Sequence, residues 1–387
     1  MVKSRPASVI EWATPEQVEF FETVTRLARK VTVDTRERDP SSTFSRRGWD
    51  RCAEVGLHGL PAPEEYGGSG ADATTTMLAL EALGYGCPDN GLVFSVQAHL
   101  WTSVVPVWKF GTEEQRKRWL PGLCSGKLIG CHAATEPEAG SDVFGMSATA
   151  RAVEGGYVLN GRKVFITNAP VADLLIVFAR TSKGIGPIGI TAFMLEAGTA
   201  GCSITEMDKM GLRTSPMGEI ALEDCLVPSD AVLGRVGRGG EVFQTSMAWE
   251  RACIMASHVG QMRRTMESCV EYARTRRQSG KPIGKFESVA DKIANMKVAV
   301  DASRALVLRA GWLMDHGMDA SLEAAVAKVF VSEASVRTHL DAVQIHGGYG
   351  YMTETEVERA LRDAIGGTIY SGTSEIQRRI IARGLGL

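Results

Sequence analysis

A chain of 387 residues is too long for one small hydrophobic core, so we expect two or three domains. A formal net charge of −2, with 23% charged residues, argues against a nucleic-acid-binding protein or one held at a membrane surface by basic residues. The eight cysteines and seven histidines show no zinc-like spacing, which argues against a metal site.

Residues 1–125 are predicted to form a helical domain. The opening stretch "MVKSRPASVIEW" lacks the apolar core of a signal peptide, and no later run is long enough to span a membrane, so we expect a cytoplasmic protein. The first helix is predicted to begin after Thr14, with Pro15 at its first position and Gln17 completing a capping box. Further helical segments follow, separated by turn-rich stretches.

Residues 126–236 are predicted to form a compact β-domain. The stretch "GGYVLNGRKVFITNA" places Asn160 and Gly161 between two β-rich runs, which predicts a hairpin turn at this dipeptide. Several short β-rich runs follow, as far as about Val236. The pattern therefore changes from helical to β near residue 126.

Residues 237–387 are again helical, in long amphipathic segments that predict an antiparallel bundle. The last helix follows the loop "IYSGTSEIQRR", in which Ser374 and Gln377 have the spacing of a capping box. The expected fold is thus mainly α, with a β-domain between two helical domains.

Three segments carry residues that suit a ligand site. "HAATEPEAGSD" begins at His132, although such stretches are most often plain strand-to-loop connections. "QIHGGYGYMTET" contains Gly347 and Gly348, whose backbone N–H groups suit a phosphate; a lone glycine pair is weak evidence. The third segment is "RDAIGGTIYSGTSEIQRRIIARG".

Together, in this order, these segments resemble the signatures of the acyl-CoA dehydrogenase family, and "YVLNGRKVFITNA" and "GLRTSP" are also similar to it. The resemblance covers nearly the whole chain. It implies an N-terminal helical domain, a middle β-barrel-like domain and a C-terminal four-helix bundle, assembled as a homotetramer. It also implies FAD, an acyl-CoA or acyl-carrier-protein thioester as substrate, and an electron acceptor such as an electron-transfer flavoprotein. In that reaction a carboxylate removes the α-proton while the β-hydride passes to the flavin.

The resemblance also implies which positions meet the cofactor and the substrate. The implied FAD contacts are His132, Ala134, Thr135, Gly140, Ser141, Phe165, Ile166, Thr167, Arg276, Gln344, Gly347, Gly348, Thr373 and Glu375. The implied substrate contacts are Ser141, Trp249, Arg251, Tyr370, Ser371 and Gly372. Arg276 matches an arginine that reaches the FAD of another subunit. His132 and His346 are more simply structural than acid–base groups.

One position departs from the pattern in a way that bears on catalysis. Most members of the family place the catalytic glutamate directly before the glycine of the final loop, where this sequence has Ser371. A serine hydroxyl is too weak a base to remove an α-proton unaided. A minority, including the isovaleryl and long-chain enzymes, carries the glutamate on a helix of the C-terminal domain, before an arginine. Glu250, before Arg251, matches that position and is the predicted base.

Three further points stay open at this stage. Ser279 and Glu287 replace residues that are common near the FAD of the family and could loosen its binding. His99 and Trp101 either shorten the acyl cavity or belong to the core. A flavin-dependent monooxygenase on the same fold, or a non-catalytic family member, is the alternative to a dehydrogenase.

Overall fold

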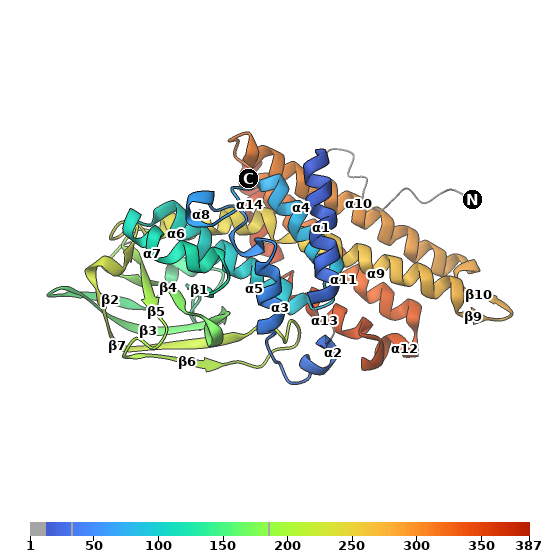
Figure 1. The fold of residues 1–387 in the computed structure, drawn as a ribbon, viewed down its shortest axis with the longest axis horizontal. Helices are drawn as coiled ribbons and strands as arrows, with labels where there is room; N and C mark the ends of the chain where they lie inside the picture. Colours follow the sequence, from blue (N-terminus) through green and yellow to red (C-terminus); the bar gives the residue numbers. More distant parts are fainter. Residues whose placement is uncertain (1–12, 32–33, 185) are drawn as a thin grey trace.

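The computed structural model describes residues 13–31, 34–184 and 186–387. Its sheet lies at the left of Figure 1 with several helices above it, and the long C-terminal helices extend to the right. Helical first and last parts with a β-sheet between them confirm the predicted fold class. The predicted domain boundaries fall within the connections 125–129 and 234–238, between a helix and a strand in each case.

The N-terminal part contains one long helix and several shorter ones. The Thr14 hydroxyl accepts a hydrogen bond from Gln17 N, and the Gln17 side chain accepts one from Thr14 N, so the predicted capping box is present. The helices are α1 (Pro15–Val31), α2 (Thr35–Arg38), α3 (Arg46–Ala53), α4 (Ala73–Gly86), α5 (Asn90–His99), α6 (Val105–Phe110) and α7 (Glu113–Cys124). A π-helical turn, Leu100–Val104, joins α5 to α6.

The β-domain is a single eight-stranded sheet among the described residues. Its strands are β1 (Gly130–Ala133), β2 (Thr149–Val153), β3 (Gly156–Thr167), β4 (Leu174–Arg180), β5 (Ile190–Glu196), β6 (Cys202–Glu206), β7 (Met217–Pro228) and β8 (Val232–Leu233). The order is β6-β7-β3-β2-β4-β5-β8, and β1 pairs with β4 in parallel. This parallel pairing aligns Gly130 with Leu174 and Ala133 with Val177.

The hairpin predicted at Asn160 and Gly161 is wrong. The turn lies at residues 154–155, and β3 continues through the Asn-Gly dipeptide with a bulge. Asn160 instead bonds to Asp224 on β7, by its side-chain amide and by the Asp224 backbone N–H. A Cβ at Gly161 would lie 2.6 Å from the Ala148 Cβ, so the glycine serves a close approach rather than a turn.

The C-terminal part is built from long helices, with two short strands, β9 (Arg277–Gln278) and β10 (Lys281–Pro282), at one tip. The helices are α8 (Gly239–Cys253), α9 (Met255–Thr275), α10 (Glu287–Asp315), α11 (Ser321–His346), α12 (Gly348–Tyr351), α13 (Val357–Gly366) and α14 (Ser374–Gly384). One hydrophobic core joins both helical parts, since Leu80 of α4, Val259 of α9 and Val331 of α11 belong to it.

Two glycines set how closely α4 and α9 cross. A Cβ at Gly84 would lie 2.1 Å from the Ser257 carbonyl oxygen, and a Cβ at Gly260 would lie 2.1 Å from the Glu81 carbonyl oxygen. No side chain fits at either position without moving a backbone. This contact fixes the start of α9, and with it the end of α8, where the candidate site lies.

Candidate active site

Glu250 lies one turn before the end of α8, and it is only 7% exposed. Its Oε1 accepts a short hydrogen bond from the Ser371 hydroxyl, whereas its Oε2 is buried and has no hydrogen-bond partner among the described residues. The two residues are 121 positions apart in the sequence. The structure therefore brings the predicted base and the serine at the usual base position into direct contact.

The loop that carries Ser371 is held in an unusual backbone conformation. Ser371 has a φ of 57° and Gly372 a φ of 90°. Gln377 Nε2 donates to the carbonyl oxygens of both residues, at 2.9 and 3.0 Å, and Arg251 Nε donates to the Ser371 carbonyl at 3.3 Å. The predicted cap at Ser374 is wrong by one residue, because the Thr373 hydroxyl accepts from Ile376 N. Gln377 is thus used to fix the loop instead of to cap the helix.

The electrostatics of Glu250 combine burial with nearby cations. Burial raises the pKa of the Glu250 carboxyl, and the Ser371 hydrogen bond, Arg251 and Lys328 oppose that rise. A carboxylate whose pKa is raised takes up a proton more readily. The environment of Glu250 therefore differs from that of a solvated glutamate.

Aromatic rings lie beside the base. The rings of Trp101 and Trp249 stack with centroids 6.1 Å apart, and Trp108 meets Trp249 edge-on at the same distance. Trp101 is fully buried and Trp249 is half-buried. His99 belongs to the core, because its Nδ1 accepts from Gly130 N at 3.0 Å and its Nε2 donates to the Leu123 carbonyl at 3.1 Å.

Tyr370, the residue before Ser371, contacts His258 of α9. The Tyr370 hydroxyl and His258 Nε2 are 2.6 Å apart, and the Tyr370 ring packs on Phe94 at 4.5 Å. Burial lowers the pKa of His258 to about 3 and raises that of the Tyr370 phenol, so both are neutral at neutral pH. They shape this region without adding charge to it.

The predicted flavin-side residues meet at the junction of β1 and β3. Val164 N donates to the Thr135 carbonyl at 3.0 Å, which places the segment after β1 against β3. Phe165 is 60% exposed with a φ of 59°, whereas its neighbour Ile166 is buried. A bulge between Lys163 and Ile166 turns the aromatic ring outward, away from the core of the domain.

The sequence reasoning missed two residues that organise this junction. Lys163 Nζ donates to Glu136 Oε1 at 2.8 Å and to the Ala134 carbonyl at 3.1 Å, and both side chains are almost fully buried. Glu136 also accepts from the backbone N–H groups of Ser147 and Ala148. A lysine and a glutamate inside otherwise β-rich and turn-rich segments were the only sequence signal.

His132 lies on β1 beside these residues. Its ring stacks on Phe243, with centroids 5.5 Å apart, and meets Phe178 edge-on at 4.6 Å. Burial lowers its pKa to about 3, and its Nε2 has no hydrogen-bond partner among the described residues. A neutral imidazole with an unpartnered nitrogen, next to the residues predicted to contact the flavin, is better suited to hydrogen-bond a polar ligand than to act as an acid or base.

The predicted FAD contacts Arg276, Gln344, Gly347 and Gly348 lie on the C-terminal helices and not at this junction. Arg276 follows α9, and its guanidinium lies 5.7 Å from the ring of Tyr349, so it meets the Gly347–Gly348 turn. In Figure 1, α12 lies at the lower right and β9 and β10, which follow α9, lie at the far right, whereas the β-domain is at the left. Gly347 N donates to the Val343 carbonyl, which leaves the amide of Gly348, at the start of α12, as the one suited to a phosphate.

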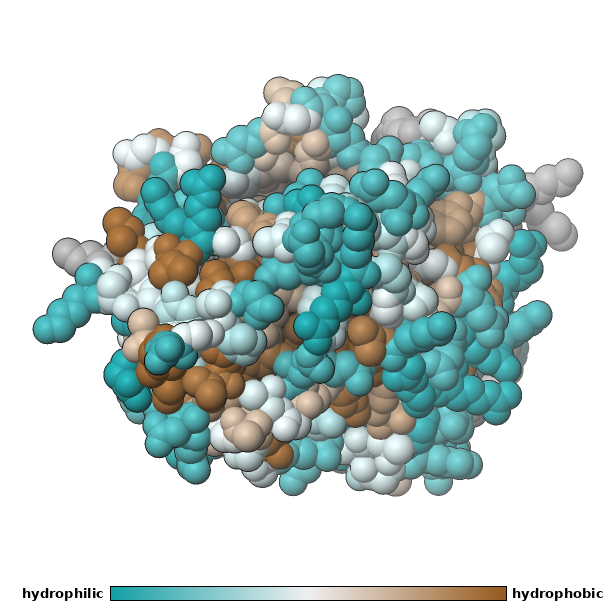
Figure 2. All heavy atoms as spheres, turned by 60° about the vertical axis from the view of Figure 1, so that its left-hand side comes forward, coloured by the Kyte–Doolittle hydropathy of each residue, from teal (hydrophilic) through white to brown (hydrophobic). Residues whose placement is uncertain are grey.

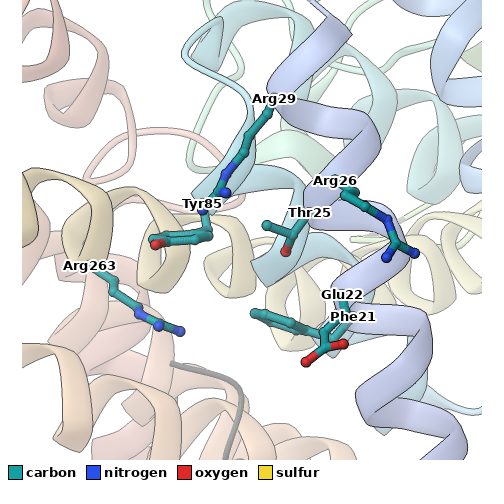
Figure 3. Close-up of a pocket in the computed structure, with 7 residues that line it drawn as sticks. All are labelled: Phe21, Glu22, Thr25, Arg26, Arg29, Tyr85 and Arg263. Atoms are coloured by element: carbon teal, nitrogen blue, oxygen red, sulfur yellow. The ribbon is translucent and has the colours of Figure 1, made fainter. Parts of the chain in front are cut away.

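A separate cavity of about 290 Å³ lies between α1, α4 and α9 (Figure 3). Tyr85 stands in it, with the guanidinium carbons of Arg263 and Arg29 lying 4.6 and 5.6 Å from the centre of its ring. None of the predicted site residues lines this cavity. It is therefore distinct from the site around Glu250.

Comparison with known proteins decides the family. Sequence profiles for the acyl-CoA dehydrogenase N-terminal, middle and C-terminal domains match residues 14–127, 131–225 and 237–386. This chain belongs to the acyl-CoA dehydrogenase family.

Among the described residues, no cluster of His, Cys, Asp and Glu suits a metal ion, and no helix is long and apolar enough to cross a membrane.

The names of several similar family members describe enzymes that act on substrates bound to a carrier protein. An L-prolyl-[peptidyl-carrier protein] dehydrogenase of Pseudomonas fluorescens is 45% identical over 90% of this chain and 92% of that protein. The crystal structure of the prolyl acyl carrier protein oxidase AnaB has a TM-score of 0.95 and 44% identity, covering 97% of this chain and all of that one. The structure of PigA with FAD and proline has a TM-score of 0.94 and 41% identity, covering 97% and 98%. The comparisons confirm the predicted family, the class of enzyme and FAD as its cofactor.

Proposed function

We propose that this protein is an FAD-dependent dehydrogenase that forms the α,β-double bond of a prolyl thioester carried on a peptidyl carrier protein, with Glu250 as the base. The observation that carries the proposal is the buried Glu250 carboxylate, whose Oε2 has no protein partner and is free to meet a substrate. The names of the similar proteins support the prolyl group and the carrier. A coenzyme A thioester presents the same reacting end and is the alternative substrate.

In this reaction Glu250 Oε2 takes the α-proton, while the Ser371 hydroxyl holds Oε1 in place. A bound FAD would supply the acceptor for the hydride of the β-carbon. The Ser371 N–H has no acceptor among the described residues, so it is available to the thioester carbonyl, where a hydrogen bond would stabilise the developing enolate. Trp249, beside the base on α8, forms part of the wall against the acyl group.

The residues at the β1–β3 junction fit a flavin. Phe165 offers an exposed aromatic face, and His132 offers an imidazole nitrogen that lacks a partner. An exposed large aromatic side chain in a left-handed backbone conformation is costly for the protein alone, and a stacked ring system would cover it. Thr135, beside this junction, and Thr373, at the start of α14, are the further contacts that we propose.

We also propose a homotetramer in which Arg276, Gln344 and Gly348 complete the FAD site of another subunit. They lie at the ends of α9 and α11 and at the start of α12, and Figure 1 draws α12 on the opposite side of the molecule from the β-domain. Hydrophobic side chains are exposed in patches on the face shown in Figure 2. Others lie on the long helices α10 and α11: Val298, Trp312, Phe330 and Leu340 are between 39% and 66% exposed. Apolar exposure of this kind is typical of subunit interfaces.

Anaerobic bleaching of the flavin by a panel of thioesters tests the proposal. We expect prolyl carrier protein to bleach the bound flavin, and isovaleryl-CoA to do so weakly or not at all. Bleaching by the CoA ester alone would show that the substrate is a coenzyme A thioester. Bleaching by no thioester, with turnover only in the presence of oxygen, would favour the monooxygenase. The proposed electron acceptor is an electron-transfer flavoprotein, which should reoxidise the bleached enzyme. The cytoplasmic location of the protein stays a prediction.

A further inference from the structure

Lys328 is a buried ionisable residue that the reaction described above does not use. It lies on α11, its side chain is 0% exposed, and its Nζ has no hydrogen-bond partner among the described residues. Burying an ammonium group without a partner costs several kcal/mol, roughly, unless a charge nearby offsets the loss of water. Such a residue calls for an explanation beyond packing.

The nearby charge is the proposed base. α8 packs against α11, and the carboxylate of Glu250 is the anion that acts most strongly on Lys328. The two side chains form no direct ion pair, and Glu250 Oε2 and Lys328 Nζ are both without a protein partner. An unpaired anion and an unpaired cation thus share one buried region in which water does not screen their attraction.

We propose that Lys328 is a positioning residue for the base: its ammonium group, buried on the neighbouring helix α11, keeps the Glu250 carboxyl ionised so that it can accept the α-proton. This inference rests on the proposed role of Glu250. Lys328 itself does not touch the reacting carbon in this account. It acts through the charge of Glu250.

The other charged groups around the pair do not replace this role. Arg251 is the cation that most opposes the raised pKa of Glu250, and its guanidinium also donates to the Ser371 carbonyl. Lys328 adds a second positive charge, whose Nζ has no hydrogen-bond partner among the described residues. Glu333 pairs with Arg378 at 2.8 Å, and Glu375 is exposed, so neither carboxylate forms a buried ion pair with the Lys328 ammonium. His258 of α9 and the Tyr370 phenol, described above, are uncharged at neutral pH.

The titration of Lys328 agrees with this arrangement. Burial lowers the pKa of its ammonium to about 8, and the carboxylate of Glu250 opposes that change. Lys328 therefore keeps its charge at neutral pH, the range in which Glu250 must be ionised. A nearby positive charge lowers the pKa of a carboxyl, so loss of Lys328 should raise the pH at which Glu250 loses its proton.

The test is the pH dependence of anaerobic flavin bleaching by the active thioester, measured with holoenzyme. We expect Lys328→Met to move the acid-side midpoint of the rate upward by about one to two pH units. Lys328→Arg, which keeps the charge, should restore the midpoint to that of the wild type. The control is Lys297→Met on α10, whose side chain is 60% exposed and paired with Asp301; it should leave the profile unchanged.

The outcomes separate this inference from the proposed function. If Glu250→Gln still bleaches at the wild-type rate, the base itself is wrong, and this inference falls with it. If Glu250→Gln abolishes bleaching but Lys328→Met keeps the wild-type midpoint, only the role of Lys328 is overturned. If methionine prevents folding, Lys328→Gln carries the same expectation, and circular dichroism with flavin absorbance confirms that each variant is folded and loaded.

Discussion

The contact between Ser371 and Glu250 makes a prediction about the serine at the position where an acid is common in the family. Ser371→Ala removes the hydroxyl that donates to Glu250 Oε1 and keeps the Cβ, so the backbone at a φ of 57° is no more strained than before. The carboxylate then loses its only hydrogen bond within the described structure. Its protonated form becomes relatively more stable.

The size of the effect follows from the type of bond. A hydrogen bond to a charged group contributes about 1.5–3 kcal/mol, and each pKa unit corresponds to about 1.4 kcal/mol. We therefore expect the pKa of Glu250 to rise by about one to two units in Ser371→Ala. Because burial already raises this pKa, the loss of the hydrogen bond adds to a rise in the same direction. Bleaching should slow on the acid side and recover as the pH rises.

The assay is the rate of anaerobic flavin bleaching by saturating substrate between pH 5.5 and 9, values chosen to span about two units around neutrality. The acid-side midpoint should move upward, while the rate at the alkaline end stays close to that of the wild type. A rate that falls equally at every pH would refute the reasoning, since it would mean that Ser371 positions the substrate and does not tune the base. An unchanged profile would mean that the hydroxyl does not hold the carboxylate in solution.

Three further predictions concern stability. Burial raises the folded-state pKa of Glu250, so the wild type loses stability as the pH rises through that pKa. Glu250→Gln removes this loss and should therefore raise Tm, relative to the wild type, more at pH 8 than at pH 5. The exposed Glu241→Gln is the control. Glu136→Ala leaves the buried ammonium of Lys163 unpaired and should cost about 3–5 kcal/mol in urea unfolding; a loss below 1 kcal/mol, roughly, would contradict the pairing. Gly84→Ala forces a Cβ onto a carbonyl oxygen of α9 and should cost about 1–3 kcal/mol, whereas an unchanged Tm would show that the helices separate freely.

The order of domains could be expected from sequence because it depends on local patterns, and the resemblance to the family predicts Glu250 as the base. The capping box at Thr14 involves residues three apart, and Glu250 precedes an arginine in a recognisable helical segment. The dipeptide at Asn160 shows the limit of such patterns. An Asn-Gly pair predicts a turn when only neighbours are considered, but here the glycine is needed for the approach of Ala148.

Contacts between distant segments could not be predicted in the same way. Lys163 and Glu136 are 27 residues apart and Glu250 and Ser371 are 121 apart, so no helical or strand period relates them. The burial of Lys328 could have been expected from the sequence. It lies between Ala324 and Val331 at the spacing of one helical face, and both of those residues are buried. A lysine on an otherwise apolar stripe predicts a buried charge, although not which anion it faces.

The central claim is that Glu250 removes the α-proton, and single-turnover flavin bleaching by Glu250→Gln tests it most directly. The variant should bind FAD as the wild type does and should lose bleaching by prolyl carrier protein by a factor of at least about 10². Glu241→Gln, an exposed glutamate on the same helix, should bleach normally. Bleaching by Glu250→Gln at the wild-type rate, with FAD bound, would contradict the account and require a different base.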